Sequence, residues 1–291
     1  MPLAHVALAV LVAAVWGFNF VVIKLGLGSF PPILFSALRF TLAALPFLWF
    51  YRDGPGVGWR WVLGIGAALG LFKFSFLFVG MDLGMPAGLS SLVLQTQAAF
   101  TVLFAALALG ERPSRRNLAG MGLAFAGIAL IGDDLGQAGA LGPFLLVILA
   151  AACWGVSNVL MKRAAARDAT RLMVWVSAVP PLPLLLLSLT WEGPDRVGSA
   201  LSGMDWGALG AVAYVAFGAT ILGFGLWGWL LRRHPAAVVA PFSLLVPVFG
   251  MSSAALMLGE TPTLASLAGG ALVVGGVAVS SLRVFSRGGA P

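Results

Sequence analysis

Charge is scarce in this sequence. Only 9% of its 291 residues are Asp, Glu, Lys or Arg, whereas a soluble domain carries about a quarter. Because so few charged side chains cannot cover a surface that faces water, the composition excludes a water-soluble globular protein. The apolar segments also leave no room for a separate soluble domain with a catalytic or nucleotide-binding role.

Cysteine, histidine and the common catalytic motifs are nearly absent as well. Cys153 is the single cysteine, and His5 and His234 are the two histidines, so the sequence offers no intrachain disulfide and no cysteine-based metal cluster. It contains no phosphate-binding loop, no His-Glu-x-x-His motif and no Gly-x-Ser-x-Gly motif. We therefore expect a protein that is not an enzyme and that uses no metal and no cofactor.

Apolar residues, in contrast, are abundant. They make up 60% of the chain, the mean hydropathy is +1.01, and they form continuous runs instead of the alternating pattern of a β-barrel strand. A helix needs about 20 apolar residues to cross a membrane. We predict an all-α polytopic membrane protein with ten transmembrane helices, at residues 4–24, 32–50, 61–80, 87–109, 117–132, 141–161, 172–191, 206–231, 236–258 and 264–284.

The basic residues of the connections fall on one side of the predicted membrane. Alternate connections, together with Arg283 and Arg287 in the C-terminal tail, hold nearly all of them, whereas the other connections hold Arg196 and most of the acidic residues. The positive-inside rule then places both termini in the cytoplasm. The same rule explains the net charge of +7, so the excess of basic residues does not indicate that the protein binds nucleic acid. The expected partners are the lipid bilayer and a small-molecule substrate, with no obligate protein partner.

The sequence repeats itself. Each copy holds five predicted helices, and because five is odd, the second copy enters the membrane inverted relative to the first. The two copies are residues 1–136 and 137–291. The residues that carry the repeat are Trp16-Gly17 and Lys24, which recur as Trp154-Gly155 and Lys162 at an offset of 138, and Pro86-Ala87, Gly110-Glu111, Pro113, Leu118-Ala119-Gly120 and Gly127, which recur at an offset of 149 as Pro235-Ala236, Gly259-Glu260, Pro262, Leu267-Ala268-Gly269 and Gly276.

With its two Trp-Gly pairs, two Gly-Glu-x-Pro junctions and ten predicted helices, the chain resembles the EamA family of the drug/metabolite transporter superfamily along its whole length. Within that family it is most similar to the bacterial aromatic amino acid exporters. The resemblance implies a multi-pass protein of the bacterial inner membrane that exports amino acids by alternating access. It implies that helices 1, 3, 4, 6, 8 and 9 line a central cavity, with helices 5 and 10 at the side. Multidrug and sugar-phosphate transport remain alternatives.

Three basic residues lie inside or near predicted spans, away from the basic connections. Lys73 is roughly 18 Å along the helix from Trp61 and 13 Å from Asp82, too deep for its side chain to reach water easily. We expect it to face an aqueous cavity and to hold a substrate carboxylate, or else to be satisfied by helix-end carbonyls. Arg39 is similar but nearer the membrane edge, and Lys24 suits the C-terminal end of its helix.

Polar and aromatic residues close to the two Trp-Gly pairs complete the candidate site. An amide one helical turn from a Trp could hold the polar head of an amphipathic solute while the ring contacts its apolar part. Helix packing is the alternative for each of these residues, above all for the aromatic stripe that contains Tyr214. The candidate substrate-binding residues are Trp16, Asn19, Lys73, Gln95, Trp154, Asn158 and Tyr214.

The acidic residues provide no visible proton relay. All ten carboxylates are expected in connections or at helix ends, and Glu111 and Glu260 are expected to cap the helices that they precede. Because proton-coupled transporters usually keep an ionisable acid at membrane depth, we expect facilitated transport, with proton coupling as the alternative. A membrane-embedded enzyme would need clustered His, Asp or Cys residues, and a channel would need a selectivity ring; the sequence shows neither.

Overall fold

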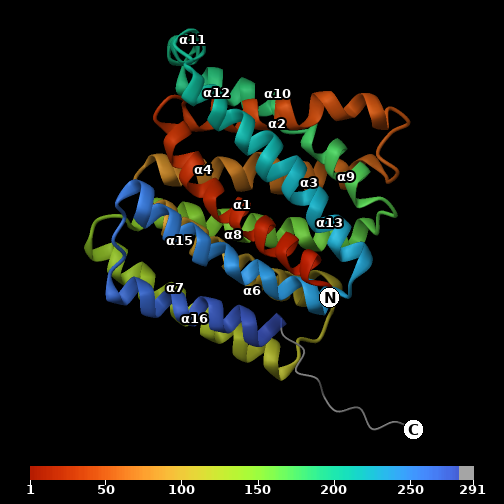
Figure 1. The fold of residues 1–291 in the computed structure, drawn as a ribbon, viewed down its shortest axis with the longest axis vertical. Coiled ribbons are helices and arrows are strands. Elements are labelled where there is room, and N and C mark those ends of the chain that lie inside the picture. The colour runs from red at the N-terminus through yellow and green to blue at the C-terminus, as the bar shows by residue number, and fades with distance from the viewer. Residues whose placement is uncertain (282–291) are drawn as a thin grey trace.

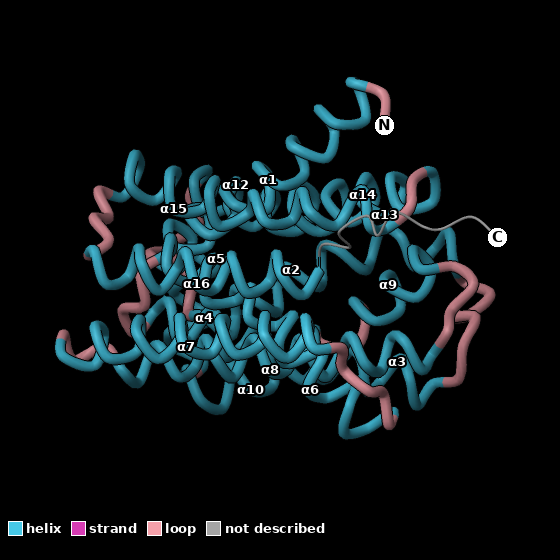
Figure 2. The backbone as a smooth tube through the Cα atoms, turned by 90° about the horizontal axis from the view of Figure 1, so that it is seen from below, coloured by secondary structure: helices cyan, strands magenta, loops and turns pink. Residues whose placement is uncertain are grey.

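The protein is a bundle of helices that run side by side. The computed structural model describes residues 1–281, which are 85% helix, and it contains no strand in that range. Figure 1 shows the helices crossing the molecule from side to side, and Figure 2 shows the loops gathered at the two ends. The prediction of an all-helical chain is confirmed.

Nine helical segments among the described residues are long and apolar enough to cross a membrane. Six of them are built from several helices: Pro32–Tyr51, Trp59–Asp82, Ala87–Leu109, Ala169–Glu192, Trp206–Arg233 and Ala240–Leu258. The first five segments consist of α1 (Leu3–Leu27); α2 (Pro32–Leu48) with η1 (Trp49–Tyr51); α3 (Trp59–Ile65), η2 (Gly66–Lys73) and α4 (Phe74–Asp82); α5 (Ala87–Val93), η3 (Leu94–Thr96) and α6 (Gln97–Leu109); and α7 (Arg115–Gln137).

The rest of the chain follows the same pattern. Its elements are α8 (Leu141–Ala164); α9 (Ala169–Ser177), α10 (Pro181–Leu187) and η4 (Ser188–Glu192); α11 (Pro194–Ser202); α12 (Trp206–Ala213), η5 (Tyr214–Leu222) and α13 (Gly223–Arg233); α14 (Ala236–Val239), η6 (Ala240–Leu244) and α15 (Leu245–Leu258); and α16 (Leu264–Ser281). The short helix α11 was not predicted. The helix α16 is shorter than the nine candidate spans. The predicted segment 264–284 extends beyond the described residues, and Arg283 and Arg287 lie outside them.

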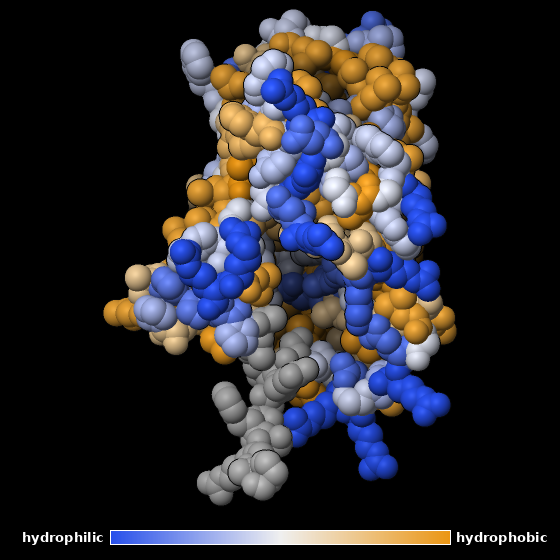
Figure 3. All heavy atoms as spheres, turned by 90° about the vertical axis from the view of Figure 1, so that its right-hand side faces the viewer, coloured by the Kyte–Doolittle hydropathy of each residue, from blue (hydrophilic) through white to orange (hydrophobic). Residues whose placement is uncertain are grey.

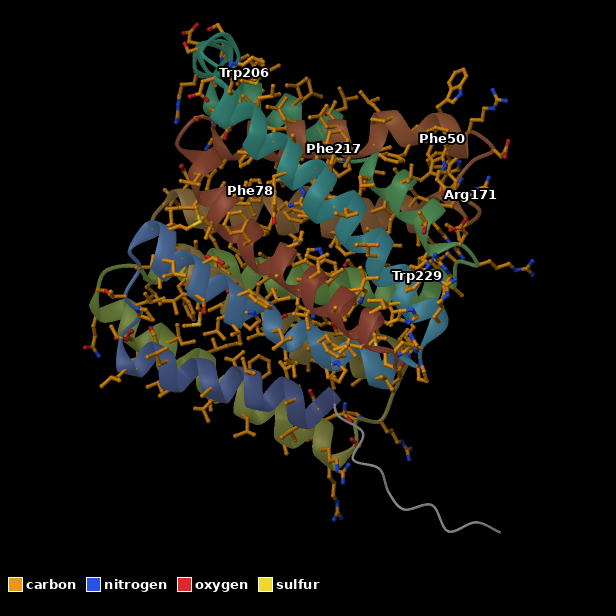
Figure 4. The ribbon with its side chains drawn as sticks, in the orientation of Figure 1. Phe50, Phe78, Arg171, Trp206, Phe217 and Trp229 are labelled. Atoms are coloured by element: carbon orange, nitrogen blue, oxygen red, sulfur yellow. The ribbon has the colours of Figure 1, made fainter. Side chains whose placement is uncertain are left out.

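The bundle has two ends, which we call the N-terminal face and the opposite face. The N-terminal face is where α1 begins, at the right in Figure 1; Figure 4 shows Phe50, Arg171 and Trp229 toward this end and Trp206 toward the other. Trp206 is 87% exposed. Exposed aromatic rings at both ends of an apolar bundle fit the two interfaces of a bilayer.

Glycines let the first helix of each predicted repeat pack closely against the other half. A Cβ atom on Gly17 of α1 would lie 2.6 Å from Cβ of Phe249 and 2.7 Å from N of Gly250, both on α15. A Cβ atom on Gly155 of α8 would lie 2.8 Å from Cβ of Phe100, on α6. Because a side chain at either glycine would overlap the neighbouring helix, the Trp-Gly pairs serve close packing.

The helices α7 and α16 pack side by side at the lower edge of Figure 1. Gly120 of α7 lies against the carbonyl of Gly276 in α16, and Gly127 lies against the carbonyl of Gly269. These small residues bring the two backbones into contact. Figure 1 shows the α7–α16 pair at the side of the bundle, away from its centre.

Two of the long segments, Trp59–Asp82 and Trp206–Arg233, contain a π-helical stretch near the middle of the segment. The stretch η2 ends at Lys73 in the third segment, and η5 ends at Leu222 in the segment Trp206–Arg233. A π-helical turn inserts an extra residue and rotates the side chains that follow it, and such turns are frequent at functional sites. Periodicity of 3.6 residues cannot give the direction of side chains near either stretch.

Candidate functional site

The N-terminal face is hollowed, whereas on the opposite face a pocket of about 470 Å³ beside Phe30, Asp82 and Asp195 lies over packed apolar side chains. Figure 3, which looks onto the N-terminal face, shows a recess near its middle with hydrophilic surface around and within it. Toward the opposite face, Phe30, Phe35, Phe78, Met81 and Met85 are buried in one apolar cluster. A solute could therefore enter from the N-terminal face but would meet packed side chains before the opposite face.

Lys73 lies buried at the end of the π-helical stretch η2. Its side chain is 5% exposed, and its Nζ atom lies 3.4 Å from the centre of the Phe74 ring and 4.6 Å from that of the Trp154 ring. Within residues 1–281, no hydrogen bond or ion pair of its Nζ atom is found. The ammonium group thus contacts aromatic rings, whose faces attract cations.

Arg39 of α2 contacts the same ring. It is 3% exposed, and its guanidinium carbon lies 3.8 Å from the centre of the Phe74 ring. Both buried cations therefore contact Phe74. Nε and Nη2 of Arg39 donate to Oγ1 of Thr220, at 3.3 and 3.0 Å.

These two cations lack an anionic partner among the described residues. The ion pair found there joins Lys162 and Glu111 instead, and Nη1 of Arg39 is buried without any hydrogen-bond partner. Burying an uncompensated charge costs several kcal/mol, and like charges repel each other strongly in a medium of low dielectric constant. The arrangement is complementary to a carboxylate or another small anion.

Trp154 and Asn158 lie one helical turn apart on α8. Trp154 contacts Lys73. Nδ2 of Asn158 donates to Oε1 of Gln97 at 2.7 Å and to Oγ1 of Thr101 at 3.0 Å, and Asn158 lines a pocket of about 300 Å³. The structure thus brings Lys73 and Trp154 together, while Asn158 ties α8 to α6 at the edge of that pocket.

Trp16, Asn19 and Tyr214 form a second group where α1 meets η5. Nε1 of Trp16 donates to the carbonyl of Ala219, and the hydroxyl of Tyr214 donates to the carbonyl of Val15, each at 2.9 Å. Both polar atoms are therefore used in helix packing. Oδ1 of Asn19 is buried without a hydrogen-bond partner, so this amide keeps an acceptor for a solute.

Gln95 lies apart from both groups, where the 3-10 helices η3 and η6 meet. Its Nε2 atom donates to the carbonyl of Ser243 at 2.9 Å, joining η3 to η6. This contact links the fourth long segment to the chain that leads into α15. Gln95 lies at the junction of the two halves, and its amide is bound to backbone.

Three members of the cation site were not among the seven candidates. Arg39 lies in an apolar run and could be recognised as a cation inside a span, but it was not included among the candidates. Nothing in the sequence pattern distinguished Phe74 from the other phenylalanines or Thr220 from the other small polar residues. Their roles follow from helix rotations that become visible only in the structure.

The expectation for the carboxylates needs correction. Glu111 and Glu260 do not cap the helices that they precede: α7 is capped by Ser114, and the hydroxyl of Thr263 accepts from the N–H of Ser266 at the start of α16. Glu260 instead caps α5. The carboxylates lie in connections or at segment ends as predicted, except that α7 extends to Gln137 and includes Asp133 and Asp134 in its last turns.

Glu192 is more buried than the sequence indicated. Its carboxylate ends η4, is 7% exposed, and accepts from the backbone N–H groups of Ile33 and Leu34, at 2.7 and 3.0 Å. It also accepts from the hydroxyl of Ser188. These three hydrogen bonds hold the start of α2 at the opposite face.

Comparisons with known proteins agree with this architecture. The model of the EamA-like transporter family matches residues 3–132 and 141–282. A protein of Salmonella typhimurium named "Probable amino-acid metabolite efflux pump" is 44% identical, with 94% of this chain and 93% of that protein covered. A protein of Escherichia coli with the same name is 41% identical over the same shares of the two chains.

A solved structure shares the fold. It is a crystal structure whose sequence is 24% identical, with a TM-score of 0.61, and the match covers 96% of this chain and 98% of that chain. At this identity the likeness concerns the arrangement of the helices alone. The full-length match shows that the whole bundle follows a known arrangement.

Proposed function

We propose a function for this chain on the premise that it belongs to the EamA-like transporter family: it exports amino acids, aromatic or other neutral ones, or similar small metabolites. The relatives from Salmonella typhimurium and Escherichia coli, both named as probable amino-acid metabolite efflux pumps, support an amino acid or a related metabolite as substrate. The hollow N-terminal face supports a route for a small solute.

The observation that carries the substrate class is the pair of buried cations on Phe74. Lys73 and Arg39 have no anionic partner among the described residues, and a substrate carboxylate would supply the missing charge with charge-assisted hydrogen bonds. Trp154 beside Lys73 offers an aromatic face to an apolar substrate side chain. A neutral amino acid presents both groups.

We also propose that residues 1–136 and 137–291 are two inverted repeats of five spans each, giving ten spans. Three structural correspondences support this. Gly17 packs on Phe249, and Gly155 packs on Phe100, so the partners also differ by 149. The π-helical stretches end at Lys73 and Leu222, again 149 residues apart. The contact of Gly120 with Gly276 matches that of Gly269 with Gly127.

Inverted repeats suit alternating access, because each half can adopt the conformation of the other and so exchange which face is open. The basic connections at the N-terminal face support a cytoplasmic position for that face in a bacterial inner membrane. The structure then corresponds to an inward-open state. Since the buried carboxylate of Glu192 is held by three hydrogen bonds at the start of α2, we propose facilitated transport without proton coupling.

Efflux from proteoliposomes tests this function. Vesicles with the purified protein are loaded with a mixture of labelled amino acids, and the loss of each is compared with the loss from protein-free vesicles. We expect neutral amino acids with large apolar side chains to leave fastest, with saturation and counterflow. Equal rates in the two kinds of vesicle would contradict amino acid export. Uphill movement driven by an imposed pH gradient would contradict facilitated transport.

A further inference from the structure

The two Gly-Glu-x-Pro junctions have the same backbone conformation. Gly110 and Gly259 have φ angles of 67° and 68° and the same ψ of 20°. The next residue in each junction donates its N–H to an equivalent carbonyl: Glu111 to that of Ala105, and Glu260 to that of Ala254. The two glutamates thus start from the same local geometry, one at each face of the bundle.

At the opposite face, Glu260 joins the two halves. Its Oε1 accepts from the backbone N–H of Ala87 at 2.7 Å, and its Oε2 accepts from that of Gly88 at 2.9 Å. Pro86, which precedes this helix, provides no side-chain cap. A carboxylate from the second half therefore satisfies the first N–H groups of the segment Ala87–Leu109 in the first half, which is favoured by both hydrogen bonding and the helix dipole.

At the N-terminal face, the corresponding glutamate is bound elsewhere. Oε1 of Glu111 lies 2.6 Å from Nζ of Lys162, and both side chains are well exposed, at 43% and 62%. By the offset of 149, the counterpart of Ala87 is Ala236, which begins α14 after Pro235. The carboxylate that could cap this helix start is instead held by the lysine at the end of α8.

The lysines follow the same scheme. Lys162 has Lys24 as its counterpart at the end of α1, and Nζ of Lys24 donates to the carbonyl of Met81 at 2.6 Å, not to Glu260. The closed face therefore has a carboxylate on a helix start and a lysine on a carbonyl. The open face has the equivalent carboxylate and lysine paired with each other.

We propose that Glu260 and Glu111 are alternating latches of the transport cycle, an inference that rests on the alternating access proposed above. In the state observed, Glu260 holds the opposite face closed on Ala87 and Gly88, and Lys162 holds Glu111 away from the start of α14. In the other state, Glu111 caps α14 and closes the N-terminal face, while Glu260 leaves Ala87 and pairs with Lys24.

This exchange has a physical advantage for a carrier. A carrier needs two states of similar free energy, because a large difference would leave one of them unpopulated. The charge-assisted cap that is broken at one face is replaced by a cap of the same chemistry at the other. Each released carboxylate finds a lysine nearby, so neither state leaves an unpaired acid at the membrane edge.

Distances between spin labels test the latches independently of transport. In a Cys153→Ala background, one label pair at positions 83 and 264 spans the opposite face. A second pair, at the equivalent positions 232 and 115, spans the N-terminal face. Leu83, Leu264, Arg115 and Arg232 are all exposed, so labels fit without repacking. Each pair reports whether its own face is open.

Removing the negative charge from Glu260 or from Glu111 should shift the ratio of the two conformations in opposite directions. Glu260→Gln removes the closed-face cap, so we expect the ratio of N-terminal-open to opposite-open molecules to fall by about tenfold. Glu111→Gln should raise the same ratio, because it removes the cap of the other state. Glu260→Asp, which keeps the charge on a shorter side chain, should shift the ratio in the direction of Glu260→Gln but less, and it covers the case that Glu260→Gln does not fold.

Asp205→Asn is the matched control. Asp205 is an acid that caps its own helix, α12, through the N–H of Ala208, so this variant should leave the ratio unchanged. Shifts in the same direction for both glutamate variants, or shifts no larger than that of Asp205→Asn, would overturn the latches.

The result is separate from the choice of substrate. Opposed shifts in a protein that moves no amino acid would keep the latches and overturn the proposed export. Amino acid efflux by the wild-type protein without opposed shifts would keep the export and overturn the latches.

Discussion

The two Trp-Gly pairs, which the proposed repeat places at equivalent positions, meet different chemistry. Trp154 contacts the ammonium group of Lys73 in η2. Trp16 instead packs against Gly223, next to Leu222, which occupies the position equivalent to Lys73. The comparison shows that the packing is repeated while the charge is present in only one half. The repeat proposed above therefore carries a candidate site whose charge lies in one half.

The largest effect is expected from removing the charge of Lys73. Lys73→Met should lower amino acid efflux by about 100-fold, because a buried charge that pairs with a substrate carboxylate contributes several kcal/mol. The equivalent change in the other half, Leu222→Met, alters no charge and should change efflux less than about twofold. Efflux from proteoliposomes measures both. Comparable losses in the two variants would remove the asymmetry.

Arg39 should show effects of opposite sign on transport and stability. Arg39→Gln should lower efflux by about tenfold. It should also raise the melting temperature of the substrate-free protein, since it removes a buried cation without an anionic partner. Arg39→Lys, which keeps the charge, should restore part of the efflux. Thermal unfolding in detergent, read beside efflux, checks this; a lower melting temperature for Arg39→Gln would argue for a purely structural role.

The packing glycines should behave alike in the two halves, in contrast to the cations. Gly17→Ala and Gly155→Ala each push a methyl group into the neighbouring helix, so each should destabilise the protein by about 1–3 kcal/mol. Gly275→Ala meets open space and serves as the control. Thermal unfolding measures all three. A loss of thermal stability in only one of the two variants, Gly17→Ala or Gly155→Ala, would show that the helix packing differs between the two halves.

The smallest effect concerns the N-terminal face, where His5 and His234 are joined by a hydrogen bond of 2.7 Å between Nδ1 and Nε2. Desolvation lowers the pKa of His234, and the positive charges of His5, the N-terminus and Arg233 lower it further. A pKa that is lower in the folded than in the unfolded chain means that stability falls as the pH drops below the ordinary histidine value of about 6.5.

The protection of residues 3–8 against hydrogen exchange, calculated relative to the intrinsic exchange rate at each pH, should therefore fall slightly in acid. The variant His234→Gln should reduce this pH dependence, because it removes the group that titrates. A pH dependence of the same size in the variant would assign the effect to another residue.

Much of this fold could be predicted from the amino-acid sequence, because a lipid environment restricts which segments can form. Long apolar runs predicted the helices, and Lys73 was recognisable by its depth in such a run. The partners of Glu260 were not recognisable, since Ala87 is 173 residues away along the chain and donates a backbone N–H that no side-chain pattern marks. The rotation that brings Arg39 onto Phe74 was also hidden, because it depends on helix packing and on the π-helical turn before Lys73.

Competition between an amino acid and its decarboxylated amine tests the central claim most directly. Efflux of labelled phenylalanine is measured with unlabelled phenylalanine or phenethylamine present on the side from which the substrate leaves. Because the two molecules share the ring and the amino group, they differ at the group that Lys73 and Arg39 are proposed to hold. We predict that phenylalanine competes and phenethylamine does not; equal competition by both would contradict carboxylate recognition at the cation pair.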